Sequence, residues 1–175
     1  MTVQLIPKPR KGEYPAYADM YINLLPAEGN LLQELKGNFQ LVKQLICSLT
    51  EEKLLYRYAP GKWTIKEVLV HIIDDERIYA YRALRFARND KTELPGFEQD
   101  DYALSSGANH RSLQGIFEEY EAVRQSTIAM FNSFTEEALI RTGIANKNST
   151  TVRALAWHIA GHEVHHLNII KQRYL

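Results

Sequence analysis

The sequence predicts an all-α protein, an antiparallel four-helix bundle with one long crossover between its second and third helices. Four long segments carry apolar residues at helical spacing, and no segment alternates as a half-buried strand does. A connection over residues 90–110, rich in turn-forming residues, separates the second helix from the third. The 175 residues fit one domain with one core.

The beginning of the chain has a different character. Four of the six prolines fall within residues 1–27. This segment is expected to be an irregular lead-in with at most a short helical turn near residues 17–24. Residues 28–175 are expected to form the single bundle domain.

The helices are expected over residues 30–49, from Thr64 to about Arg88, over 113–134 and over 150–174. Thr64 stands three residues before Glu67, which is the spacing of a capping box after the break at Pro60-Gly61. Short helical turns join the first helix to the second and the third to the fourth, so each pair is expected to form a hairpin. A loop is expected at residues 142–149. Cys47 follows the apolar face of the first helix and is expected to be buried.

Composition limits the classes of function. Lys plus Arg and Asp plus Glu number 21 each, which gives no basic surface for nucleic acid or an anionic membrane. No apolar run reaches the roughly 20 residues that a membrane span requires, and the first ten residues do not form a secretory signal. A single cysteine excludes an internal disulfide. A cytoplasmic location is the expectation that follows.

Histidines are concentrated in the last helix, where four of the six fall within residues 158–166. His162 and His166 continue a stripe with the spacing of a buried helix face, formed with Leu155, Ile159 and Ile169. Two imidazoles in an apolar stripe are unfavourable unless each has a partner. One metal ion can be shared by an i, i+4 pair, so a metal site is expected here.

The segment from His162 to His166 also fits H-E-x-x-H, the pattern of zinc proteases. Those enzymes take a third ligand further along the chain, but only nine residues follow His166, and none is His, Asp, Glu or Cys. The third ligand is therefore expected upstream, at His71 of the second helix. Glu163 is the candidate general base, although it is offset from the ligand stripe.

Three imidazoles with open positions suit a divalent transition metal. Zinc and nickel are the leading candidates, and iron and manganese are the alternatives. Asp75 or Asp74 is expected to accept the other ring N–H of a ligand histidine. His158 and His165 are expected to be solvated or to lie beside the ligands, and His110 to be incidental.

Several motifs, taken in order, resemble the DinB-like superfamily, in particular its branch of YfiT-type metal-dependent hydrolases. They are Pro60-Gly61-Lys62-Trp63-Thr64-Ile65-Lys66-Glu67 leading to His71, Leu94-Pro95-Gly96-Phe97, the segment around Arg124, and Val152-Arg153-Ala154-Leu155 leading to Gly161-His162-Glu163-Val164-His165-His166. The resemblance covers the chain from about residue 15 onward.

The resemblance implies a four-helix bundle whose metal is held by His71, His162 and His166. It also implies a tendency to form homodimers. Some members of the family transfer low-molecular-weight thiols, others isomerise thiol adducts, and many have no known activity. In this family the metal is thought to activate a thiolate or water.

The leading hypothesis is a metal-dependent enzyme acting on a small molecule, either a hydrolase or an S-transferase that uses a low-molecular-weight thiol. The alternative is a non-catalytic, stress-responsive bundle that binds a structural metal. A catalytic site needs an open coordination position and access to solvent, whereas a structural site would be closed by His158, His165 or Glu163. A third possibility is a bundle without metal.

Overall fold

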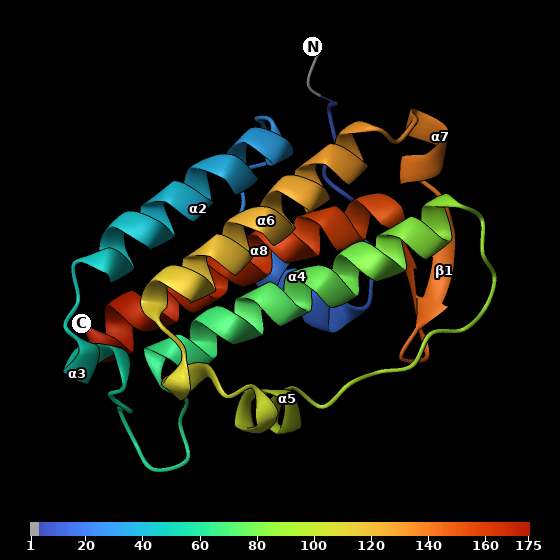
Figure 1. The fold of residues 1–175 in the computed structure, drawn as a ribbon. Helices are drawn as coiled ribbons and strands as arrows, with labels where there is room; N and C mark the ends of the chain where they lie inside the picture. Colours follow the sequence, from blue (N-terminus) through green and yellow to red (C-terminus); the bar gives the residue numbers. More distant parts are fainter. Residues whose placement is uncertain (1–3) are drawn as a thin grey trace.

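The computed structural model describes residues 4–175, and its four long helices confirm the predicted bundle (Figure 1). Each of the four helices is preceded by a residue whose side chain accepts a backbone N–H of the first turn, and Thr64 forms the predicted capping box with Glu67. The bundle consists of α2 (Leu31–Cys47), α4 (Ile65–Ala87), α6 (Leu113–Asn132) and α8 (Val152–Ile169).

The long crossover determines how the four helices are arranged. Residues 88–112 lead back to the end of the bundle at which α4 begins, so α4 and α6 run in the same direction (Figure 1). The Lys66 ammonium near the start of α4 donates to the Arg111 carbonyl just before α6. Both α4 and α2 pack mainly on α6 and α8. The expectation that α2 pairs with α4, and α6 with α8, as hairpins was therefore wrong, because the two helices of each pair lie across the bundle from each other.

Shorter elements connect the bundle helices. The lead-in contains two short helical turns in succession, where at most one was expected, and a five-residue π-helical segment extends α8 to Tyr174. The short helices are η1 (Ala16–Ala18), α1 (Asp19–Ile22), α3 (Glu51–Leu54), α5 (Gln99–Ser105), η2 (Ala108–His110), α7 (Glu136–Leu139) and η3 (Ile170–Tyr174). No helix within residues 4–175 is both long and apolar enough to cross a membrane.

A β-hairpin occupies residues 142–151, where the sequence predicted only a loop. Strands β1 (Thr142–Ala145) and β2 (Asn148–Thr151) pair antiparallel, with Ala145 opposite Asn148. Asn146 and Lys147 both have positive φ, as a two-residue hairpin turn requires. The signal was missed because Lys147 stands where glycine is usual. Leu94 of the crossover exchanges backbone hydrogen bonds with this hairpin, so β1 anchors the long connection.

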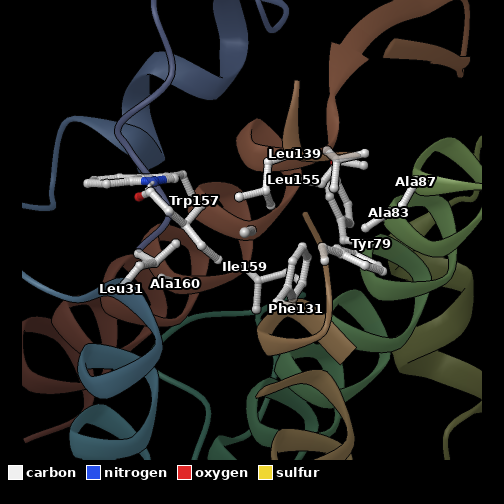
Figure 2. Close-up of a cluster of buried hydrophobic side chains, with 14 of the residues drawn as sticks. Leu31, Tyr79, Ala83, Ala87, Phe131, Leu139, Leu155, Trp157, Ile159 and Ala160 are labelled. Atoms are coloured by element: carbon white, nitrogen blue, oxygen red, sulfur yellow. Dashed lines mark hydrogen bonds between the residues drawn. The ribbon is translucent and has the colours of Figure 1, made fainter. Parts of the chain in front are cut away.

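The core lies between the bundle helices and extends to the lead-in. Figure 2 shows Leu155, Trp157 and Ile159 of α8 among side chains from α2, α4, α6 and α7. The Trp157 indole N–H donates to the Ile6 carbonyl, which joins the lead-in to α8. Cys47 is exposed at the end of α2, which corrects the expectation that it is buried. The apolar stripe of α2 has turned away from the core at that position.

A close backbone contact holds α1 against α8. A Cβ atom at Gly161 would lie 2.3 Å from the Tyr21 carbonyl oxygen. Glycine therefore allows α1 to approach α8 more closely than any other residue would. The contact places the Tyr21 ring edge-on against three histidines of α8, which are His158, His162 and His165.

We expect Gly161→Ala to lower the free energy of unfolding by about 1–3 kcal/mol, because two backbones would have to separate. Gly37→Ala is the matched control, since a Cβ atom there meets nothing within 4 Å in the exposed middle of α2. The control should gain up to about 1 kcal/mol from its better helix propensity. Urea unfolding measures both variants, and equal stability would contradict the close approach of α1.

Candidate metal centre

Three buried histidines converge between α4 and α8. His71 comes from α4, while His162 and His166 lie one turn apart on α8. The Nε2 atom of His162 is 3.0 Å from the Nε2 atoms of both His71 and His166. Ligand atoms from all three side chains lie within 4.8 Å of one another. The structure thus brings together the three residues expected to bind a metal.

The donor set fits a cation better than it fits internal hydrogen bonds. A ring nitrogen of neutral imidazole offers either one N–H or one lone pair. The Nε2 atom of His162 faces two other Nε2 atoms, so it cannot form a full hydrogen bond with both. Nitrogens bound to one ion at 2.0–2.1 Å stand about 3 Å apart, which is close to the observed spacing. One divalent metal would satisfy all three nitrogens.

Burial keeps these imidazoles uncharged. It lowers the pKa of His162 and of His166 well below the ordinary value, and the neighbouring histidines lower both further. Burial also lowers the pKa of His71, although nearby Asp75 and Asp100 act in the opposite direction. Neutral imidazole is the form that binds a metal, so the three nitrogens are ready to coordinate near neutral pH.

The two aspartates expected to support a ligand histidine have different surroundings. The Oδ2 atom of Asp75 lies 3.4 Å from Nδ1 of His162 and 3.3 Å from Nε2 of His158. A carboxylate there favours the His162 tautomer that carries its proton on Nδ1 and presents a lone pair at Nε2. Asp74 instead lies 3.9 Å from Arg77, away from the three histidines.

Aromatic rings enclose the histidines. Trp63 lies against His71, with ring centroids 4.7 Å apart. Tyr79 stacks flat on His158 at 3.7 Å. The Trp63 contact restricts the ring of His71, which belongs to the cluster, whereas the Tyr79 contact restricts His158, which lies beside it. His165 is only partly buried, and His110 is exposed.

Two cavities of about 320 Å³ each reach the histidines from different sides. One is lined by His166 and Trp63, and the other by His162 and Asp75. Gln99, the first residue of α5, lines both cavities. The 90–110 connection therefore forms a wall of the site, and it leaves openings large enough for small molecules.

Glu163 is directed away from the cavities, although it is adjacent to His162 in sequence. It is 0% exposed, and its carboxylate accepts hydrogen bonds from Arg124 and from the Tyr120 hydroxyl. Arg124 also binds Glu76, at 2.9 Å, and the Leu35 carbonyl. This buried network joins α6, α4, α8 and α2. Sequence reasoning noted the Arg124 segment but did not find the network, because its members come from four separate helices.

Arg82 and Tyr21 also belong to the cavity on the His162 side and were missed. The sequence could have indicated Arg82, because it lies seven residues, or two helical turns, after Asp75 and therefore on the same face of α4. No comparable signal exists for Tyr21, whose place depends on the packing of α1 against α8.

The fold and the site define a class, namely four-helix bundles with a buried three-histidine cluster that can hold a metal ion. The sequence matches the DinB superfamily over residues 34–170, and the chain belongs to that family.

Individual relatives agree with this assignment. A curated protein of Oceanobacillus iheyensis, named a "putative metal-dependent hydrolase", is 27% identical over 146 residues. The match covers 80% of this chain and 81% of the relative. The solved structure of YfiT from Bacillus subtilis, described as a probable metal-dependent hydrolase with an unusual four-helix bundle topology, superposes with a TM-score of 0.65. It is 18% identical, and the match covers 94% of this chain and 92% of YfiT.

We expect the metal-free protein to lose stability as the pH falls through about 6.5. The pKa values of His71, His162 and His166 are lowered in the folded chain, so the unfolded chain binds more protons in this range. Thermal unfolding of chelator-treated protein from about pH 8 to pH 5.5 measures the effect. Replacing His71 and His166 together by Gln should flatten the profile, and an unchanged profile would contradict the burial of neutral imidazoles.

Proposed function

We propose that the protein is a metal-dependent hydrolase acting on a small molecule. The observation that carries this proposal is the convergence of three buried imidazoles beside cavities of small-molecule size. Membership of the DinB superfamily supports it, as does a relative named for metal-dependent hydrolysis. The proposed metal ligands are His71, His162 and His166.

An open coordination sphere favours catalysis over a purely structural metal. Within residues 4–175, the group of side chains able to share an ion contains three histidines and no fourth ligand. His158 faces Asp75, Glu163 faces Arg124, and His165 is not part of the group. Structural zinc sites are normally closed by four protein ligands, whereas catalytic sites keep a position for water or substrate.

When bound, a divalent transition metal supplies a Lewis acid and lowers the pKa of a coordinated water or thiol toward neutrality. The residues of the chain do the rest. Asp75 holds His162 in the coordinating tautomer, and Trp63 restricts the ring of His71. The walls formed by the 90–110 connection limit the substrate to a small molecule. Glu163 is proposed to stabilise the bundle through Arg124 rather than to act as a base.

Transfer of a low-molecular-weight thiol is the second candidate reaction, and it rests on the family resemblance. The same three histidines would serve it, since a coordinated thiol and a coordinated water are activated in the same way. Assays with small esters and amides, with and without a panel of such thiols and a generic electrophile, separate the two reactions. A homodimer is also proposed on the resemblance, and sedimentation velocity tests it.

The ligand set suits several metals. Imidazole binds zinc, nickel and ferrous iron well, and we propose zinc or nickel as the resident ion, with iron or manganese as alternatives. Reloading the metal-free protein with each ion in turn, followed by activity assays, tests this choice.

We expect His162→Ala to abolish metal binding, because its Nε2 atom stands between those of the other two ligands. Plasma mass spectrometry on protein without a polyhistidine tag should give about one metal per chain in the parent and none in the variant. His110→Ala, which removes an exposed histidine, should retain the metal. Full occupancy in His162→Ala would refute the ligand assignment.

We expect Asp75→Asn to weaken metal affinity about 10- to 100-fold, because the amide no longer holds His162 through a charged oxygen. Competition with a chromogenic chelator measures the affinity. Asp74→Asn is the matched control, since Asp74 faces Arg77, and it should bind metal as the parent does. Equal affinities for the two variants would exclude the proposed role of Asp75.

A further inference from the structure

Arg82 projects a buried charge into the cavity on the His162 side. It is 6% exposed and lines the same 320 Å³ cavity as His162 and Asp75. Arg82 follows Asp75 by seven residues on α4, which is about 10 Å along the helix axis. The Arg82 guanidinium and His162, the member of the three-histidine cluster that lines this cavity, therefore occupy two separate regions of one cavity.

The Arg82 guanidinium has no acidic partner. Its only hydrogen bond within residues 4–175 is from Nη2 to the Pro95 carbonyl, at 3.0 Å, and no carboxylate of these residues lies within 4.0 Å. A guanidinium carries five N–H groups, so most of its donors are free. The buried Arg124 differs from Arg82, because Arg124 binds two buried carboxylates. A buried cation without a counter-charge is costly unless a ligand supplies one.

The surroundings prepare this guanidinium for a planar anion. The rings of Tyr79 and Phe97 lie 5.0 and 6.0 Å from its central carbon, which supports its charge and restrains its orientation. The hydroxyls of Tyr17 and Tyr79, 3.4 Å apart, and the side chain of Asn146 also line the cavity as neutral hydrogen-bonding groups.

Two acidic residues line the cavity as well, and neither neutralises Arg82. Asp75 lies between the imidazoles of His158 and His162 at the far end. Glu98 is exposed and precedes α5. The Arg82 end of the cavity therefore keeps a positive charge that can attract an anion.

We propose that this cavity binds a small carboxylic acid, with its carboxylate on Arg82 and its reactive bond beside His162, the histidine of the cluster that lines the cavity. The proposal rests on the proposed function for the position of the reactive bond, and on Arg82 alone for the carboxylate. Guanidinium forms paired hydrogen bonds with a carboxylate, and a single positive charge matches a single negative one. The substrate therefore carries its carboxylate several bonds from the bond that reacts.

The first test uses metal-free protein, so it does not depend on the metal site. Glutarate and its uncharged diamide are titrated into isotope-labelled protein, and binding is followed by nuclear magnetic resonance. We expect glutarate to bind at least tenfold more tightly, which corresponds to about 1.4 kcal/mol. Equal binding of the two probes, or no binding of glutarate, would overturn the proposal. A phosphonate analogue that bound more tightly than glutarate would overturn the choice of a carboxylate.

Variants assign the preference to one residue. Arg82→Gln should remove the preference for glutarate, and Arg82→Lys should keep part of it, because the charge remains without the paired donors. Arg88→Gln removes an equivalent charge from the exposed end of the same helix and should change nothing. If circular dichroism shows that Arg82→Gln does not fold, the preference for glutarate over the diamide in Arg82→Lys and in the wild-type protein still tests the role of Arg82. A preference that survives in Arg82→Gln would place the anion elsewhere.

A second test joins the two regions of the cavity. Zinc-loaded protein is titrated with straight-chain hydroxamates that end in a carboxylate, and with their methyl esters. Both forms should bind through the hydroxamate if the histidines hold an accessible metal, and the acid should bind at least tenfold more tightly at one chain length. Failure of both forms would refute the metal site, whereas equal affinity of acid and ester at every length would refute the role of Arg82.

Discussion

The antiparallel packing of α4 against α8 is the contact on which the rest of the structure depends. Every imidazole of the cluster comes from one of these two helices, and so does Asp75, whose carboxylate lies beside His162. Burying a neutral imidazole without a hydrogen-bonding or metal partner costs free energy. The packing of α4 against α8 therefore depends on polar contacts as well as on apolar ones. Burial of the apolar clusters around this interface is the favourable contribution to the free energy of folding, and it offsets the cost of burying the histidines.

A second polar group braces the bundle on another side of α8. Arg124 reaches Glu76 of α4 and Glu163 of α8 from α6, and it also donates to the Leu35 carbonyl of α2. Such a network costs desolvation energy, but it fixes how the helices align along their axes. Glu163 and His162 are neighbours in the chain, so alignment fixed at one is transmitted directly to the other.

The sequence determined the long-range features that depend on periodicity. The stripe of α8, whose members are alternately four and three residues apart, distinguished His162 and His166 from His158 and His165. The capping box at Thr64 located the start of α4. Periodicity does not determine which helices are neighbours, so the expected pairing of α2 with α4 and of α6 with α8 was wrong. The β-hairpin was missed because its turn uses Asn146 and Lys147, and local propensity favours glycine at the second position. Cys47 is exposed because the apolar stripe of α2 no longer faces the core at the end of that helix.

The parts of the cavity come from different regions of the chain. The three histidines proposed as metal ligands lie on helices, whereas Phe97, Gln99 and Asn146 come from the crossover and the hairpin that anchors it. Connections tolerate substitution better than packed helices do. The proposed metal site can therefore remain constant while the cavity walls change, so a chain with this plan could accept new small molecules without any change in the three histidines. Relatives with the same three histidines would then differ chiefly in what their crossovers admit.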